Sequence, residues 1–291
     1  MRRLLVAIWC ALCGMAAQAA VTAPDASGKP LTLTGPAQRI VSLSPHATEM
    51  LYAIGAGRQL VATVDYSNYP PAARLLPRVG GYSGVSLEAV LRQRPDLVVA
   101  WQDGGNPQEL ERLRQLGLAV FVSHPLQLDD VATEMQGLGQ LTGRPMQAEA
   151  AARRYRQRLA QLRLHYAHRA PVTVFYQISS APIFTVSQRS FMGAMMQLCG
   201  GRNVFGPLAQ AAPQVGIEAV VAAQPQVMLA GRADVLAMWD RWPVLPAVAR
   251  HTRYVLNEDL LTIPGPRLVD GAAALCATLD TARRTLGLTL D

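Results

Sequence analysis

Residues 84–101 read GVSLEAVLRQRPDLVVAW, and residues 214–231 read QVGIEAVVAAQPQVMLAG. Glu218 follows Glu88 by 130 residues, Pro225 follows Pro95 by the same distance, and apolar residues match at nearly every position between them. A repeat at one fixed spacing indicates that the chain contains two copies of one structural unit. This repeat sets the fold expected for the whole chain.

Each copy of the repeat predicts a short helix followed by a buried strand. The helix begins beside Glu88 or Glu218, where the positive end of the helix dipole favours a carboxylate. Pro95 and Pro225 then end it, because proline cannot continue a helix. The runs DLVVA and QVMLA that follow are typical of strands buried on both faces of a parallel sheet. We therefore expect an α/β protein whose two lobes face each other across a cleft, the usual place for a ligand.

The rest of the sequence divides the chain into four parts. Residues 1–19 begin MRR, continue with a short apolar run and end in AQA, which is typical of a secretory signal peptide rather than a buried helix. After its first residue, the run 145–167 contains no glycine or proline and predicts one helix of about 35 Å that crosses between the lobes. The expected parts are the signal peptide (1–19), an N-terminal lobe (20–143), an interlobe helix (144–169) and a C-terminal lobe (170–291).

Charge and cysteine content narrow the classes of function. The net charge of +7 becomes +5 without Arg2 and Arg3 of the signal peptide. The arginines are scattered along helices without a continuous basic block, which favours solvated helix surfaces over nucleic-acid binding. Of the four cysteines, Cys199 and Cys276 remain after residue 19. An even pair in an oxidising compartment favours a disulfide, and two separate buried thiols are the alternative.

Enzyme signatures are not recognisable in the sequence. The chain has no phosphate-binding GxxxxGK, no GxSxG and no HExxH motif. His46 lies at the start of a predicted helix, but no second ligand stands at metal-binding spacing from it. We therefore expect a protein that is not an enzyme and has neither a metal site nor a cofactor of its own.

Aromatic residues gather in segments that follow predicted strands, including a predicted loop at 178–186. They are Tyr66, Tyr69, Tyr82, Trp101 and Phe184. A second long loop is expected at 257–266. Because loops at the carboxyl ends of strands bind ligands in α/β folds, these rings favour a cleft wall for a large, flat, partly apolar ligand. Alternatively, each ring closes off the end of a sheet.

Several segments resemble one protein family. They are LSPHATE (43–49), DYSNYPP (65–71), PDLVVAW (95–101), LCGGRNVF (198–205), PQV (213–215) and the stretch 265–276. Together they are similar to the periplasmic vitamin B12 (cobalamin) binding proteins of ABC importers, which are class III substrate-binding proteins with a chelatase-like fold. The similarity covers nearly all of the chain after residue 19. It implies two Rossmann-like lobes with parallel sheets, joined by one long rigid helix, with the corrinoid in the cleft between them.

The resemblance also implies roles for individual residues. It places the family's disulfide at the cysteine pair named above and ligand contacts at five positions. Those positions are Tyr66, Tyr82, Trp101, Phe184 and Asp259. Glu88 and Glu218 match two acids that dock on arginines of the two transmembrane subunits. In the alternative they only favour the start of their helices, each by about 0.3–1 kcal/mol.

The sequence departs from the family pattern at Tyr82 and Ala212, where we expect tryptophan, and at Ile263, where we expect arginine. We predict a monomeric periplasmic protein that captures cobalamin and delivers it to a permease dimer with its ATPase. One alternative is a haem or ferric-siderophore binding protein of a related importer, in which Tyr66 or Tyr82 would ligate iron. Another is a metal-dependent enzyme built on the same fold.

Overall fold

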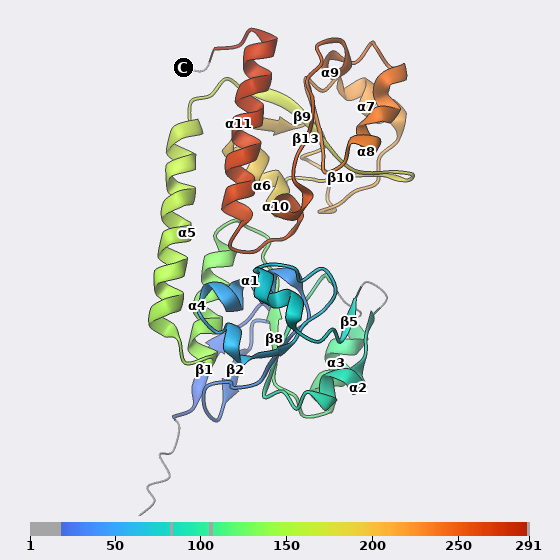
Figure 1. The fold of residues 1–291 in the computed structure, drawn as a ribbon. Coiled ribbons are helices and arrows are strands. Elements are labelled where there is room, and N and C mark those ends of the chain that lie inside the picture. The colour runs from blue at the N-terminus through green and yellow to red at the C-terminus, as the bar shows by residue number, and fades with distance from the viewer. Residues whose placement is uncertain (1–18, 82–83, 105–106, 290–291) are drawn as a thin grey trace, which may run out of the picture.

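The computed structural model describes residues 19–81, 84–104 and 107–289. Two lobes lie one above the other, and α5 (Pro145–Tyr166) runs along the side of both (Figure 1). Each lobe contains a largely parallel sheet with helices packed around it. The expected fold class, two α/β lobes joined by one long helix, is therefore confirmed.

The N-terminal lobe is built on a four-stranded parallel sheet in the order β4-β3-β7-β8. An antiparallel hairpin of β1 and β2 precedes it, and β1 packs against α4. The strands are β1 (Val21–Pro24), β2 (Pro30–Leu33), β3 (Ile40–Ser42), β4 (Leu60–Ala62), β5 (Gly80–Gly81), β6 (Gly84–Val85), β7 (Leu97–Trp101) and β8 (Val120–Ser123). The helices are α1 (Pro45–Ala53), η1 (Gly57–Gln59), η2 (Pro71–Leu75), α2 (Leu87–Arg92), α3 (Pro107–Gln115) and α4 (Asp130–Leu141).

The C-terminal lobe has a sheet in the order β10-β9-β12-β13, with β11 also pairing with β9. All pairs are parallel except β10 with β9. The strands are β9 (Val172–Ser180), β10 (Ile183–Thr185), β11 (Gly201–Asn203), β12 (Val227–Ala230) and β13 (Arg253–Val255). The helices are α6 (Phe191–Leu198), α7 (Ile217–Ala223), α8 (Ala233–Ala237), η3 (Met238–Arg241), α9 (Pro246–Ala249), α10 (Glu258–Thr262) and α11 (Leu268–Leu286).

The two repeat helices, α2 and α7, end in the same way. Arg94 has a φ of 48° and Gln224 a φ of 45°, and each residue directly precedes its proline. A proline disfavours the right-handed helical region for the residue before it, so the backbone leaves each repeat helix at the equivalent position. The helix-to-strand transition that the repeat predicts is therefore set locally by Pro95 and Pro225.

The repeat also extends to the hydrogen bonds at the start of the repeat strands. Asp96 Oδ1 accepts from the backbone N–H of Arg39, just before β3, at 2.9 Å. In the second lobe Gln226 Oε1 accepts from the backbone N–H of Thr173, in β9, also at 2.9 Å. In both copies the side chain after the proline therefore ties the repeat strand to its parallel neighbour.

The linking helix α5 is continuous over 22 residues, as the sequence predicts. It packs closely against α4, because a Cβ on Gly139 would stand only 2.2 Å from Ala148 Cβ. Near its middle, Arg158 forms an ion pair with Asp270 in the first turn of α11, at 2.6 Å. Among the described residues, no helix combines the length and apolar character that a membrane crossing requires.

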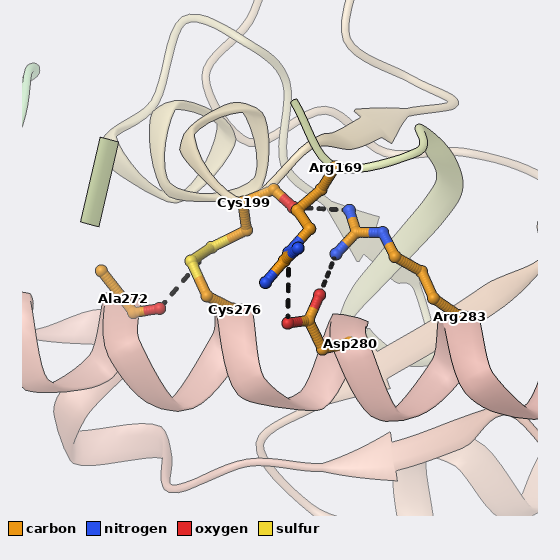
Figure 2. Close-up of a disulfide and its surroundings, with 6 residues drawn as sticks. All are labelled: Arg169, Cys199, Ala272, Cys276, Asp280 and Arg283. Carbon is orange, nitrogen blue, oxygen red and sulfur yellow. Dashed lines mark hydrogen bonds and ion pairs between the residues drawn. A yellow bond between two sulfur atoms is a disulfide. The ribbon is translucent and has the colours of Figure 1, made fainter. Parts of the chain in front are cut away.

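The predicted disulfide joins Cys199, at the end of α6, to Cys276 in α11 (Figure 2). Beside it lies the fully buried guanidinium of Arg283, which donates to the backbone carbonyls of Cys199 and Ala170 at 2.7 Å each and to Asp280 at 2.6 Å. The disulfide and this arginine therefore hold α11 against the end of α6 and the segment that leads into β9.

Two segments that we expected to be loops contain regular structure, so those expectations were wrong. Within 178–186, β9 continues to Ser180 and the chain returns as β10, with Ser179 Oγ donating to the backbone carbonyl of Pro182 at 2.7 Å. Within 257–266, α10 forms because the side chain of Asn257 accepts from the N–H of Asp259 at 3.0 Å. Local side-chain hydrogen bonds of this kind leave no trace in hydrophobic periodicity.

Candidate functional site

The carboxyl ends of the strands in each lobe face the other lobe. Helix α1 begins directly after β3, α10 follows β13, and both lie at the junction of the lobes (Figure 1). Across this junction Arg267 forms an ion pair with Glu49 of α1. A Cβ on Gly265 would lie 3.5 Å from His46 Cα. Ligands of α/β folds bind at the carboxyl ends of strands, so this junction is the candidate site.

In the N-terminal lobe, two of the predicted ligand-binding residues lie at strand ends. Tyr66 follows β4, is 69% exposed and has a φ of 63°, a conformation that costs energy for a residue other than glycine. Trp101 is the last residue of β7 and is partly buried. Its ring and that of His46 form a T-shaped pair, with ring centroids 5.3 Å apart and planes at 82°. Tyr82 lies outside the described residues.

In the C-terminal lobe, Phe184 is partly buried in β10, opposite Ser179 of β9. Asp259 is exposed in the first turn of α10. Burial raises the pKa of Glu49 and the hydrogen bond to Glu49 raises the pKa of Arg267, and the nearby charge of Asp259 adds to both shifts. The structure thus brings Asp259 to the interlobe junction, while Tyr66 and Phe184 stand on opposite lobes.

A series of buried, hydrogen-bonded polar side chains begins at His46, next to Trp101. His46 is 1% exposed, and its Nε2 is 2.7 Å from Ser123 Oγ. Ser123 Oγ donates to Glu134 of α4, which also accepts from the backbone N–H of His124 at 2.7 Å. When Glu134 is ionised, the serine hydroxyl gives its one proton to that carboxylate, so His46 donates from Nε2 as the neutral Nε2–H tautomer.

Burial also shifts the pKa values of the first and last side chains of this hydrogen-bonded series. Burial lowers the pKa of His46 to about 3 and raises the pKa of Glu134 to about 7. His46 is therefore a buried, neutral hydrogen-bonding group. Among the described residues, no cluster of three histidine, cysteine or acidic side chains could hold a metal ion.

Sequence reasoning missed Ser123 and Glu134. Ser123 ends the buried strand β8 and could have been found by its place at the carboxyl edge of the sheet. Glu134 lies in the second turn of α4 with no local pattern that marks it.

The segment that follows Trp101 also packs against its ring. A Cβ on Gly104 would stand 2.2 Å from Cε3 of the indole. The ring is thus fixed between Gly104 on one side and His46 on another, which limits the positions it can take without any ligand present.

The two predicted docking acids lie on the repeat helices, one in each lobe. The side chain of Glu88 is 84% exposed and pairs with Arg92 at 2.7 Å, one turn along α2. Glu218 is exposed in the first turn of α7. In Figure 1, α2 and α7 lie on the side of the molecule away from α5. Both carboxylates are therefore available to a partner.

Two surface hollows lie against α5, away from the strand ends. One is lined by residues of α4 and α5, including Gln140 and Met146, and the other by residues such as Arg158 and His165. Neither contains a predicted site residue, and both are bordered by exposed flexible side chains. They do not compete with the interlobe junction as a candidate site.

Comparison with known proteins identifies the family. The profile of a protein family described as periplasmic binding protein matches residues 40–260. The chain belongs to this family. The match begins at β3 and ends in α10, so it spans the parallel strands of both lobes of this periplasmic binding protein.

Individual relatives of this periplasmic binding protein bind large ring-shaped ligands. The vitamin B12-binding protein of Vibrio cholerae is 40% identical over 252 residues, which cover 86% of this chain and 91% of that protein. The crystal structure of the periplasmic vitamin B12 binding protein BtuF of Vibrio cholerae matches with a TM-score of 0.81, covering 86% of this chain and 99% of that one. A periplasmic heme binding protein from Pseudomonas aeruginosa, 28% identical, matches with a TM-score of 0.73 over 83% of this chain and 92% of that one. Because the fold is common to both ligand types, the ligand must be argued from side chains.

Proposed function

We propose that this periplasmic binding protein captures cobalamin between its lobes and delivers it to the permease of an ABC importer. The observation that carries the proposal is the 40% identity to the Vibrio cholerae vitamin B12-binding protein, spread over 91% of that relative. The ligand undergoes no chemical change in this role, so the site needs shape and hydrogen bonds rather than catalytic groups.

Binding would rest on flat aromatic contacts and on polar groups around them. The exposed ring of Tyr66 and the fixed ring of Trp101 offer two apolar surfaces at the carboxyl edge of the first sheet. Phe184 and Asp259 would complete the wall from the second lobe, and Tyr82 is a further candidate outside the described residues. Rings of this kind bury large apolar area with little loss of side-chain freedom.

Delivery of cobalamin to the permease would use one equivalent carboxylate from each lobe. The exposed carboxylates of Glu88 and Glu218 occupy equivalent places in the repeat, so a dimeric permease could contact them with equivalent basic residues. A leader peptide at residues 1–19 would bring the chain to the periplasm, where it would act as a monomer with the permease and its ATPase.

The ligand is tested by titration of the mature protein with cyanocobalamin. We expect saturable one-to-one quenching of tryptophan emission, most of which is lost in W101F and kept in the control W242F. Haem provides the competing outcome: a shifted Soret band that weakens in Y66F, with no cobalamin binding, would overturn the proposal in favour of haem transport. A turnover of either compound would contradict a pure binding role.

Docking is tested with the double variant E88A/E218A. We expect unchanged cobalamin affinity and reduced cobalamin uptake in cells or proteoliposomes that contain the permease. The matched control is E111A/E149A, which removes two other exposed glutamates from helices α3 and α5. Equal uptake by both double variants would mean that Glu88 and Glu218 only stabilise the starts of their helices.

A further inference from the structure

One side chain of the second lobe reaches directly into the first. Arg267, immediately before α11, donates from Nε to Glu49 Oε2 at 3.0 Å and from Nη2 to Glu49 Oε1 at 2.5 Å. Glu49 lies in α1, so this two-pronged pair joins the lobes without passing through α5. Two parallel hydrogen bonds fix orientation as well as distance.

The pair is buried, which makes it sensitive to the loss of one partner. The side chain of Glu49 is 3% exposed and that of Arg267 is 20% exposed. Burial raises the pKa of Glu49 despite its bonds to the guanidinium, whereas those same bonds raise the pKa of the more solvated Arg267. A buried carboxylate left without its arginine is strongly unfavourable, so the pair holds the lobes at one spacing.

The same guanidinium also packs on the aromatic loop at 65–71. Its Cζ lies 4.1 Å from the centre of the Tyr69 ring, which is a cation–π contact. Within the first lobe, Arg78 donates to the backbone carbonyls of Val64 and Ser67. The loop that carries Tyr66 is therefore held from its own lobe by Arg78 and from the opposite lobe by Arg267.

We propose that Arg267 is a positioning residue for the ligand, holding the 65–71 loop and the start of α1 at a fixed place relative to the second lobe. The inference rests on the proposed function, because Tyr66 is placed there as a wall of the cobalamin site. A preformed wall costs the ligand less ordering on binding, so its loss acts mainly on the rate of dissociation.

The chain contains a matched control for this proposal. The Arg158–Asp270 pair joins α5 to α11, has a length of 2.6 Å and is about half exposed. Asp270 lies three residues after Arg267, and Arg158 belongs to the interlobe helix rather than to the aromatic loop. R158M therefore removes an arginine at the same end of α11 without releasing Tyr69.

The first measurement is the dissociation rate of cyanocobalamin by stopped-flow fluorescence. We expect dissociation to be roughly tenfold faster in R267M, intermediate in R267K, which keeps the charge but loses the fork, and unchanged in R158M. If R267M does not fold, E49Q/R267M replaces the whole pair with neutral groups and carries the same expectation.

The second measurement needs no ligand. Spin labels on L75C and V244C, two exposed positions on opposite lobes, report the distribution of interlobe distances. We expect a broader distribution in R267M or E49Q/R267M than in wild type and R158M. If the pair had only a structural role, its substitution would lower thermal stability but leave the dissociation rate of cyanocobalamin and the interlobe distance distribution of the folded protein unchanged. That result would overturn the proposal.

The two measurements separate this inference from the proposed function. Failure of wild type to bind cobalamin would refute the proposed ligand, and an unaltered distance distribution would then also refute the positioning role. Normal cobalamin binding by wild type with equal dissociation rates in R267M and R158M would refute the positioning role alone.

Discussion

The buried series of hydrogen-bonded side chains that begins at His46 predicts an unusual dependence of stability on pH. Its two ends have pKa values shifted in opposite directions: Glu134 from 4.5 to about 7 and His46 from 6.5 to about 3. One pKa unit corresponds to about 1.4 kcal/mol, so the full contributions to the free energy of unfolding are about 3 kcal/mol for Glu134 and about 5 kcal/mol for His46. The perturbations are E134Q and H46Q, which remove one titration each and keep a hydrogen-bonding side chain.

The signs of the two contributions follow from proton binding. Between pH 4.5 and about 7 the folded protein holds a proton on Glu134 that the unfolded chain has released, so this contribution to stability falls as pH rises. Between about pH 3 and 6.5, His46 is protonated in the unfolded chain but neutral in the folded protein, so its contribution to stability rises with pH. The slopes are each about 1.4 kcal/mol per pH unit. They therefore cancel between pH 4.5 and 6.5 in the wild type.

Urea unfolding followed by circular dichroism at pH 4.5, 5.5 and 6.5 tests this cancellation. Over those two units, the stability of E134Q relative to wild type should rise by about 3 kcal/mol and that of H46Q should fall by about as much. The charges of Asp25 and Asp130 add to the effect of burial in raising the pKa of Glu134. E149Q, at an exposed glutamate, is the control and should show no slope. Flat differences for both variants, or differences of one sign, would refute the assignment of burial as the dominant cause.

Three further substitutions test the packing around the site and the second lobe. In G104A the new methyl group must displace the Trp101 ring, which it would meet at 2.2 Å, so cobalamin affinity in a fluorescence titration should fall roughly tenfold with little change in melting temperature. The double variant C199A/C276A opens a link between residues 77 apart and should lose about 4 kcal/mol in guanidinium unfolding, matching reduced wild type. R283M leaves buried carbonyls and a carboxylate without their donor and should cost about 3–5 kcal/mol; a cost below 1 kcal/mol would show that solvent replaces the arginine.

The fold could be predicted where short-range rules act alone. The repeat helices and strands follow from prolines at fixed spacing, and α5 follows from a long run without helix breakers. The β9–β10 turn and α10 were not predicted, because each depends on one side chain, Ser179 or Asn257, that satisfies a particular backbone group. Neither bond changes the hydrophobic pattern.

The site was predictable only in its outline. Aromatic residues at strand ends mark the edge of the sheets from sequence alone, and Trp101 does lie at such an end. The groups that fix those rings come from distant parts of the chain: His46 meets Ser123 across 77 residues, and Arg267 meets Glu49 across 218. No local pattern encodes such pairs, since the first forms only when the N-terminal lobe has folded and the second only when the two lobes have met.

The charges near the junction bear on which ring-shaped ligand is favoured. Ile263 ends α10 as an apolar, partly buried residue at the position where we expected arginine, and Asp259 in the same helix is acidic. Arg267 commits both Nε and Nη2 to Glu49 and its face to Tyr69, so it is poorly placed to receive a ligand carboxylate as well. Haem carries two carboxylates, whereas the periphery of cobalamin carries mainly neutral amides that can donate to Asp259. The electrostatics of this wall therefore favour the amide-rich ring, which agrees with the ligand proposed from the relatives.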